Sequence, residues 1–239
     1  CWEEGIPLLL ELMKRYRLQV FNYKKLSESH RQLAIFYENI LKGERYKHEY
    51  FRVGFYGHGL PLFVRNKVFI YRGLEYESIP AFTQRLQAEF PHAKLLSHNT
   101  PPDDVTRSAD EQFIQICAVK PLAEPRSEFD GVEVDERILK YYNNNQIKKF
   151  ILDRPVHRGQ IDKDNEFKNL WIERIIYTTE CELPGILKWF EVSEQVTEQV
   201  CPPKYACETV QINIQQIRHM TAHYKSNPKV NIVGKYRFK

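Results

Sequence analysis

Long hydrophobic runs are missing from this sequence, so we expect no membrane-spanning helix. The longest apolar stretch runs from Ile6 to Leu10 and is interrupted by Pro7, whereas a helix that crosses a bilayer needs about 20 apolar residues. The first residue is Cys1 rather than Met, and a helical pattern is already under way there. We therefore expect the sequence to be a fragment of a longer chain.

Cysteine is also scarce, and neither sign of charge dominates. The five cysteines are odd in number and dispersed, with no Cys-x-x-Cys pair, which predicts a reduced, intracellular protein. The 35 basic and 31 acidic residues leave a net charge of only +4. Proteins that bind nucleic acid electrostatically usually concentrate basic residues, so we expect no nucleic-acid partner.

Aromatic residues, by contrast, are abundant. They make up 13% of the chain and include 14 Tyr and 14 Phe, while hydrophobic residues reach 42% and charged residues 28%. These proportions are typical of a globular protein and exclude wholesale disorder. The abundance of Tyr and Phe predicts a half-buried sheet or an adhesive surface.

Helical periodicity marks the first forty residues. Apolar side chains at three-to-four spacing predict helices over 6–18 and 26–41, joined by a short loop over 19–25. Ser27 is the predicted N-cap of the second helix, and Gly43 is predicted to end it. Two helices joined so closely form an antiparallel hairpin.

Strand patterns fill the middle of the chain, and one more helix follows them. The predicted strands cover 50–56, 63–71 with a bend at 65–67, 112–119, 147–152, 170–179 and 187–192, with a helix over 79–90. Arg154-Pro155 is expected to end the strand that begins at 147, and a final helix is predicted over 204–224. Helices at the ends of a sheet region indicate the α+β class: a helical hairpin, an antiparallel sheet lobe and a C-terminal helix.

One spacing near the last helix resembles a metal site. Cys201, Cys207, His219 and His223 have the spacing C-x5-C-x11-H-x3-H. A zinc finger requires its two cysteines two to four residues apart, and here Pro202-Pro203 lies inside a wider gap. We expect no metal and no cofactor, and we keep a zinc-binding or nucleic-acid module on these four residues as the alternative.

The strongest strand run combines aromatic and charged residues, as in Trp171-Ile172-Glu173-Arg174. A half-buried sheet of this kind can dock a partner through aromatic and Arg anchors, although an ordinary sheet surface explains the pattern equally well. The nucleotide-binding and hydrolase motifs GxxxxGK[ST], GxSxG and HExxH are all missing. The residues alone therefore favour a binding module over an enzyme with its own active site.

Several segments resemble the DOCK (dedicator of cytokinesis) family, in its catalytic DOCK homology region two. They are CWEE at 1–4, FYENI at 36–40, YFRVGFYG at 50–57, VFIYRGLEY at 68–76, DNEF at 164–167, LWIER at 170–174, IYTT at 176–179, LPGILKWFEV at 183–192 and Glu208-Thr209. The likeness runs from Cys1 to about Tyr224 and is similar to the Rac-activating subgroup.

The resemblance implies guanine nucleotide exchange on a Rho-family GTPase, with Rac as the expected one. In the family, a helical first lobe supports dimerisation, a second lobe of antiparallel sheets contacts the GTPase, and a helical third lobe carries a nucleotide-expelling loop. Residues 1–47 match the end of the first lobe, 48–202 the second and 203–239 the start of the third. At segment level, the expected partner-binding residues are Asn165, Phe167, Trp171, Glu173, Arg174 and Thr178.

After Tyr224 the sequence departs from the family pattern, so we expect the chain to dock a GTPase without the expelling loop and to be weak or inactive alone. The resemblance also implies a cytoplasmic protein in actin and cell-migration signalling, recruited to the plasma membrane through regions outside this sequence. A possible homodimer would form through the upstream helical lobe. A scaffold fragment without GTPase affinity is the second alternative.

Overall fold

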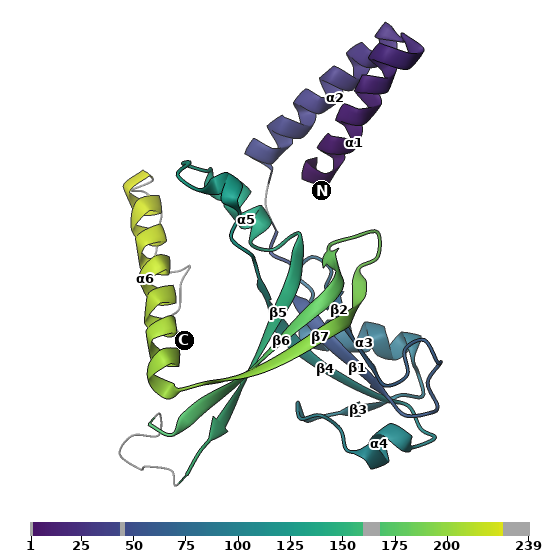
Figure 1. Ribbon diagram of the computed structural model, residues 1–239, viewed down its shortest axis with the longest axis vertical. Helices are drawn as coiled ribbons and strands as arrows, with labels where there is room; N and C mark the ends of the chain where they lie inside the picture. The colour runs from purple at the N-terminus through teal and green to yellow at the C-terminus, as the bar shows by residue number, and fades with distance from the viewer. Residues whose placement is uncertain (1, 44–45, 160–167, 227–239) are drawn as a thin grey trace. The chain divides into compact units, whose positions relative to one another are not determined.

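The computed structural model describes residues 2–43, 46–159 and 168–226, apart from some side chains between 216 and 226 (Figure 1). The chain divides into two compact units. Unit 1 holds Cys1–Phe150 and Tyr177–Glu194, and unit 2 holds Ile151–Ile176 and Gln195–Lys239. The lobe boundaries after residues 47 and 202 stay predictions.

Unit 1 begins with two packed helices, α1 (Trp2–Arg15) and α2 (Tyr23–Lys42), which confirms the predicted hairpin. The helices approach closely because Gly5 has no side chain, and a Cβ there would lie 2.9 Å from the ring of Phe36. Gly43 ends α2 as predicted, and its N–H donates to the carbonyl four residues earlier at 2.7 Å.

The connection between these helices is tighter than the predicted loop over 19–25. A π-helical segment, Tyr16–Val20, extends α1, and the chain reverses at Phe21, whose φ of 53° is left-handed. Asn22 caps α2, because its side chain accepts a hydrogen bond from a backbone N–H three residues later at 3.0 Å. Ser27 therefore lies inside the helix, and its prediction as N-cap was wrong. Asn and Ser cap equally well, so residue type alone does not choose between them.

Seven strands form one sheet in the order β1-β2-β7-β6-β5-β4-β3, and β1 pairs with β4 as well. Their bounds are Tyr50–Tyr56 (β1), Lys67–Arg72 (β2), Lys94–Leu96 (β3), Phe113–Leu122 (β4), Ile147–His157 (β5), Leu170–Leu183 (β6) and Trp189–Val200 (β7). The pairings of β1 with β2 and β4, and of β2 with β7, are antiparallel, whereas β3 runs parallel to β4. Because β1 pairs on both sides, the sheet closes on itself and leaves β3 outside the ring. The α+β class and the antiparallel sheet are confirmed.

β1 is buried on both faces along its whole length. One face carries Phe51, Val53 and Phe55, which belong to the same buried cluster as residues of α3 (Ile79–Glu89). The rings of Phe51 and Phe82 stack with their centroids 4.3 Å apart. Buried aromatic pairs add stability beyond the area they remove from water, so this layer is the main apolar core of unit 1.

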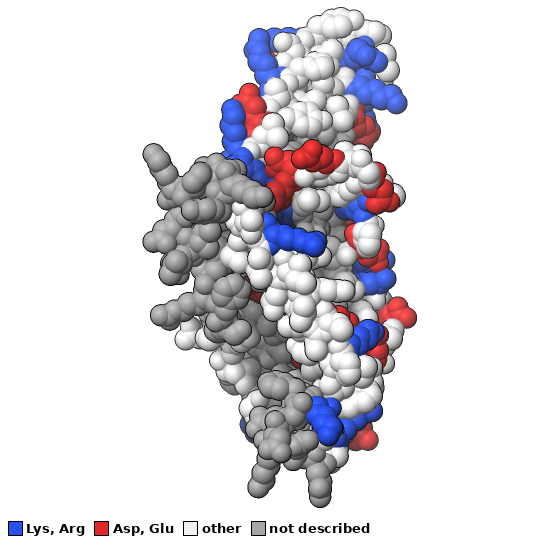
Figure 2. Space-filling view, turned by 90° about the vertical axis from the view of Figure 1, so that its left-hand side faces the viewer, with Lys and Arg blue, Asp and Glu red and all other residues white. Residues whose placement is uncertain are grey.

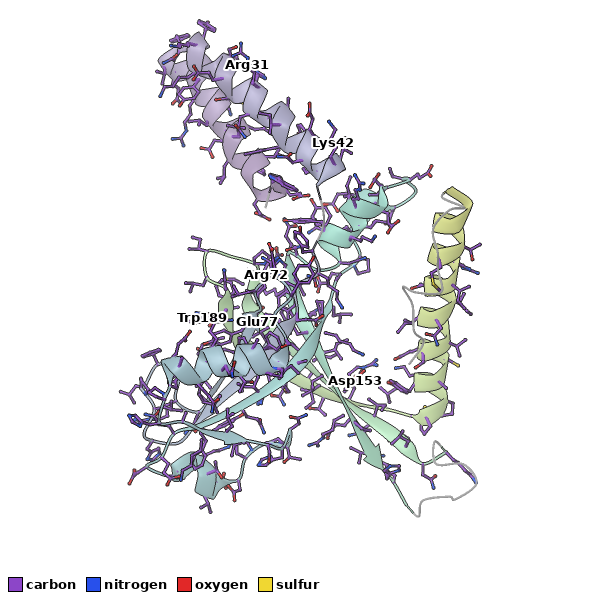
Figure 3. All side chains as sticks on the ribbon, turned by 180° about the vertical axis from the view of Figure 1, so that it is seen from behind. Arg31, Lys42, Arg72, Glu77, Asp153 and Trp189 are labelled. Carbon is purple, nitrogen blue, oxygen red and sulfur yellow. The ribbon has the colours of Figure 1, made fainter. Side chains whose placement is uncertain are left out.

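Aromatic residues of β2 and β7 extend that core, among them Trp189, which is labelled in Figure 3. Trp189 stands opposite Tyr71 in the strand register, with ring centroids 6.1 Å apart. Its ring also lies 5.5 Å from that of Phe69. Beside this cluster, the carboxylate of Glu77 binds Arg85 of α3 through two hydrogen bonds of 2.8 and 2.9 Å. In this part of the predicted half-buried sheet, the aromatic side chains therefore pack into the core.

The other face of β1 places a cation inside the ring of strands. Arg52 is only 6% exposed and donates to the hydroxyl of Tyr56 at 2.7 Å and to the side-chain carbonyl of Gln115 on β4. Its guanidinium also lies 5.8 Å from the ring of Tyr177. Within the part of the chain that is described, Arg52 forms no ion pair and its Nε has no hydrogen-bond partner. The ring therefore encloses a polar centre.

Two strand predictions were wrong at their ends. The stretch 63–65 is part of a turn, and β2 begins at Lys67 after Asn66, whose φ of 54° is left-handed. β5 continues through Pro155 to His157 instead of stopping there. Proline lacks an N–H donor and often ends a strand, but it does not have to where no neighbour needs that donor.

Three short helices lie in segments without a clear sequence pattern. α4 (Asp104–Ser108) lies between β3 and β4, a 3₁₀ turn covers Ser127–Phe129, and α5 (Glu136–Tyr142) precedes β5. Their apolar residues are too few for periodicity to show.

Unit 2 consists of the outer halves of β5, β6 and β7 followed by α6 (Pro202–Ser226). The predicted final helix is confirmed. No helix within the described ranges is long and apolar enough to cross a membrane.

Candidate functional site

The expected partner-binding residues centre on β6. Trp171, Glu173 and Arg174 lie in its unit 2 part, and Thr178 lies in its unit 1 part. Asn165 and Phe167 fall outside the described residues. The four described residues are all partly buried, and their role as contacts stays a prediction.

Alternation along the strand separates these side chains. Successive residues of a strand point to opposite faces, so Trp171 and Glu173 share one face and Arg174 occupies the other. Thr178 contributes a backbone contact, because its carbonyl accepts a hydrogen bond from the hydroxyl of Ser193 at 3.1 Å. We call the unit 2 parts of β5, β6 and β7 (residues 151–157, 170–176 and 195–200) the ribbon. The pattern Trp-Ile-Glu-Arg therefore contributes side chains to both faces of this ribbon.

The face with Trp171 carries two arginines from β5 and the residue just after it. The guanidinium of Arg158 lies 4.5 Å from the Trp171 ring centroid, a cation–π arrangement. Glu173 forms an ion pair with Arg154, which is 26% exposed. The remaining nitrogens of Arg154, Nε and Nη1, are buried with no hydrogen-bond partner in the described chain.

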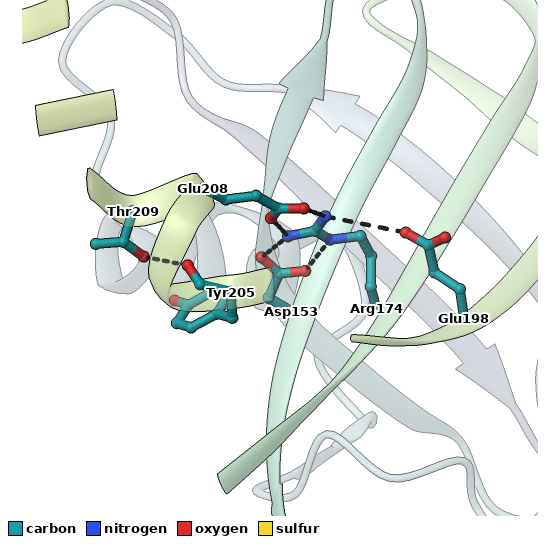
Figure 4. A network of polar contacts seen from close by, with 6 residues as sticks. All are labelled: Asp153, Arg174, Glu198, Tyr205, Glu208 and Thr209. Carbon is teal, nitrogen blue, oxygen red and sulfur yellow. Dashed lines mark hydrogen bonds and ion pairs between the residues drawn. The ribbon is translucent and has the colours of Figure 1, made fainter. Parts of the chain in front are cut away.

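The opposite face is organised by Arg174 (Figure 4). Its Nε and Nη2 donate to the two carboxylate oxygens of Asp153 on β5 at 2.8 and 3.2 Å. Nη2 and Nη1 donate to the carboxylate of Glu208 on α6 at 2.9 and 3.3 Å. Glu198 on β7 adds a longer ion pair, with 3.9 Å between nitrogen and oxygen. One guanidinium thus joins three strands and a helix.

Electrostatics follow from this geometry. The hydrogen bonds that Arg174 donates to Asp153, and then those to Glu208, raise the pKa of Arg174 above its ordinary value, against the opposing effect of burial. The Arg174 side chain is 13% exposed and all three of its nitrogens have partners. Each nitrogen of the guanidinium is therefore already engaged within the chain.

Sequence reasoning missed Asp153, Glu198 and Arg154 as members of this site. Asp153 and Arg154 are adjacent on β5, yet strand alternation sends one to Arg174 and the other to Glu173. Glu208 was noticed only within a family segment. The signal that was available is the acidic character of β7, which carries Glu191, Glu194 and Glu198, but pairing across strands needs the register.

A separate hollow of about 230 Å³ lies in unit 1, between the β4–α5 loop and the ends of β5 and β6. The guanidinium of Arg126 stands 4.0 Å from the ring centroid of Tyr142 at its wall. Glu124, Glu182 and Lys148 also line it, so the hollow selects neither sign of charge.

Metal ligands do not gather in the described part of the chain, where no group of three or more His, Cys, Asp or Glu side chains could hold an ion. Cys201 lies just before α6 and Cys207 is exposed on it. The side chains of His219 and His223 lie outside the described residues, so the four-residue zinc alternative stays a prediction.

Charges of both signs are interspersed on the face of the molecule seen in Figure 2, where several blue and red side chains adjoin each other. This distribution agrees with the small net charge of +4.

Comparison with known proteins decides the family. The family described as DHR-2, Lobe B matches residues 99–182. Dedicator of cytokinesis protein 3 of Mus musculus is 41% identical over 224 residues, which cover 94% of this chain and 11% of that protein. Dedicator of cytokinesis protein 4 of Homo sapiens is 38% identical over 232 residues, or 97% of this chain and 12% of that protein.

The chain belongs to the dedicator of cytokinesis family. It corresponds to part of the DHR-2 region, which confirms the resemblance stated from its motifs. DOCK-like protein 1 of Saccharomyces cerevisiae is 23% identical over 223 residues, covering 90% of this chain and 11% of that protein. The chain spans only about a ninth of the length of these DOCK relatives.

Proposed function

We propose that this chain is the part of a guanine nucleotide exchange region that docks a Rho-family GTPase, and that the GTPase is Rac. The observation that carries the proposal is the likeness to dedicator of cytokinesis proteins 3 and 4 over 94% and 97% of the chain. The sheet supports it, because the side chains of Gln195, Val196 and Thr197 on β7 are exposed and available to a partner.

An exchange factor of this kind works through coupled equilibria rather than covalent chemistry. It binds the nucleotide-free GTPase more tightly than the loaded form, and by reciprocity it weakens nucleotide binding by the same factor. A coupling of about 100-fold corresponds to roughly 2.7 kcal/mol. The docking surface must therefore distinguish the two states of the GTPase.

The lobe assignment is part of the proposal. Residues 1–47 belong to the end of the first lobe, 48–202 to the second and 203–239 to the start of the third. The match of the Lobe B family to residues 99–182 supports it, since this range lies inside the second lobe. We place the protein in the cytoplasm, in actin and cell-migration signalling. The upstream helical lobe would supply dimerisation, and other regions would supply membrane recruitment.

Titration of the purified chain against Rac tests the proposal. We expect nucleotide-free Rac to bind at least tenfold more tightly than GDP-loaded or GTP-loaded Rac. A second Rho-family GTPase, titrated in the same three states, tests the choice of Rac. Equal affinity for all states, or no binding, would contradict the exchange function and favour a scaffold.

A further inference from the structure

The attachment of α6 to the ribbon in unit 2 is small. Along the described part of α6, the side chains that are less than exposed in the first two turns are Pro202, Tyr205 and Glu208, which share one face at a spacing of three. Further along, Val210, Ile212, Ile214 and Ile217 are exposed, all between 43% and 55%, whereas Met220 is half-buried. Among the described side chains, the hydrogen bonds that join α6 to a strand are therefore made near its N-terminal end, at Glu208.

Glu208 is the charged member of that short face, and its partner is Arg174. The two sets of hydrogen bonds that Arg174 donates connect different elements. Its bonds to Asp153 join β6 to β5, two strands that are already neighbours in the sheet. Its bonds to Glu208 join the sheet to a helix that has no backbone ladder with it. Loss of the second set should therefore change the helix more than the sheet.

The hydrogen bonds at Glu208 affect the position of the rest of the helix, because the helix extends far beyond them. About 27 Å of helix separates Glu208 from Ser226 at 1.5 Å per residue, so a tilt of roughly 10° at the base moves the far end by about 5 Å. An arginine suits this position because its planar, rigid fork fixes direction, whereas a lysine would supply only a mobile point charge.

We infer that Arg174 is a positioning residue, which sets the direction of α6 on the ribbon through Glu208 and acts on the GTPase through that helix rather than by contact. Removal of Arg174 leaves the carboxylates of Asp153 and Glu208, which now share one guanidinium, facing each other without a cation. The tie then becomes a repulsion. The part of the inference that concerns the GTPase rests on the proposed function.

Pulsed electron spin resonance on the full chain directly tests the joint, by which we mean the attachment of α6 to the ribbon through Arg174 and Glu208. Spin labels at Thr197 on β7 and Gln215 on α6 use two exposed positions, with every cysteine except the buried Cys117 replaced by serine. We expect Arg174→Met to broaden the distance distribution at least twofold, and Glu208→Gln to broaden it less because no repulsion is created. Arg154→Met is the matched control, since it removes an ion pair on the other face and should leave the width unchanged.

A charge exchange guards against simple misfolding. Arg174→Glu should broaden the distribution, and adding Glu208→Arg should narrow it again, because Arg at 208 then faces both Glu at 174 and Asp153. Three results would each overturn the inferred role of Arg174 in the joint. They are an unchanged width of the distance distribution in Arg174→Met, equal broadening in Arg154→Met, or no recovery in the exchanged pair.

Exchange kinetics of the dedicator of cytokinesis protein that contains this chain test the role toward the GTPase. We expect Arg174→Met and Glu208→Gln to lower the maximal exchange rate together, the former about tenfold, with the half-saturating Rac concentration unchanged. A rise in that concentration with Arg174→Met alone would instead identify Arg174 as a contact and overturn the inference. If the unmodified protein fails to bind Rac, the proposed function falls, while the spin-label comparison still decides the joint.

Discussion

The two units each place an arginine on a strand, and they satisfy its charge in opposite ways. In unit 1, Arg52 lies inside a closed ring of strands with a phenol, an amide and an aromatic face as its partners. In unit 2, Arg174 lies on an open ribbon and binds the carboxylates of Asp153 and Glu208. Uncharged partners surround Arg52, which the ring of strands encloses; we call this group the neutral cage. Ion pairs suit a junction between separate elements, because they give direction without a large apolar interface.

The comparison predicts that unit 1 depends on apolar packing far more than unit 2 does. Phe82→Ala removes a fully buried ring that stacks on Phe51, and we expect a loss of about 3–5 kcal/mol in the free energy of unfolding. Urea denaturation followed by fluorescence measures it. Phe63→Ala, at a residue 67% exposed, is the control and should change stability by less than about 0.5 kcal/mol. Similar losses in both variants would contradict this core.

The second prediction concerns the neutral cage. Arg52→Met keeps most of the side-chain volume but leaves the side-chain carbonyl of Gln115, which is 0% exposed, without its donor. An unpaired buried acceptor costs about 1–3 kcal/mol, and we expect a loss of that size in chemical denaturation. A variant as stable as the parent would show that the desolvation of the guanidinium cancels its hydrogen bonds.

The third prediction is a pH dependence in unit 1. The hydrogen bond from Arg85 lowers the pKa of Glu77, against a smaller opposing effect of burial. A lowered pKa means that the unfolded chain binds more protons. The stabilisation is therefore complete above the ordinary carboxyl pKa of about 4.3 and is lost as the pH falls below it. Urea denaturation of Glu77→Gln should show a loss of about 1 kcal/mol at pH 7, discounted because Arg85 is partly exposed, and a smaller loss at pH 3, where part of the carboxylate is protonated in the unfolded and then in the folded chain. An equal loss at both pH values would mean that the charge plays no part.

The smallest change in the free energy of unfolding is expected on the face of β6 that carries Trp171 and Glu173. Arg154→Met breaks the ion pair with Glu173 but also removes two buried nitrogens that lack hydrogen-bond partners among the described residues. These contributions oppose each other, so we expect a change within about 1 kcal/mol in thermal or chemical denaturation. A loss above about 2 kcal/mol would show that this face contributes to folding stability as strongly as the Arg52 cage does.

Local patterns in the sequence predicted the elements well where hydrophobic periodicity is long. The helices α1, α2, α3 and α6 and the strand β1 all appear at their predicted places. The failures lie where a neighbour decides the outcome. Pro155 stays within β5 although proline often ends a strand, and Asn22 rather than Ser27 caps α2 because of where the chain reverses.

The candidate site was less predictable than the fold. The strand carrying Trp171, Glu173 and Arg174 was recognised, but its division into two faces with different partners was not. Arg174 and Glu208 are 34 residues apart, and no local spacing relates a residue of β6 to a helix that follows the next strand, β7. The stripe Val210, Ile214 and Ile217 was predicted correctly as helical, yet its exposure could not be read from periodicity.

The division of β5, β6 and β7 between the two units has a consequence for how this region can be inherited. The chain passes from one unit to the other after Phe150, Ile176 and Glu194. No single cut releases either unit, and no contiguous gene segment encodes unit 1 alone. Recombination can therefore exchange the two units only as one block, so that substitutions on either side must remain compatible with the same three strands.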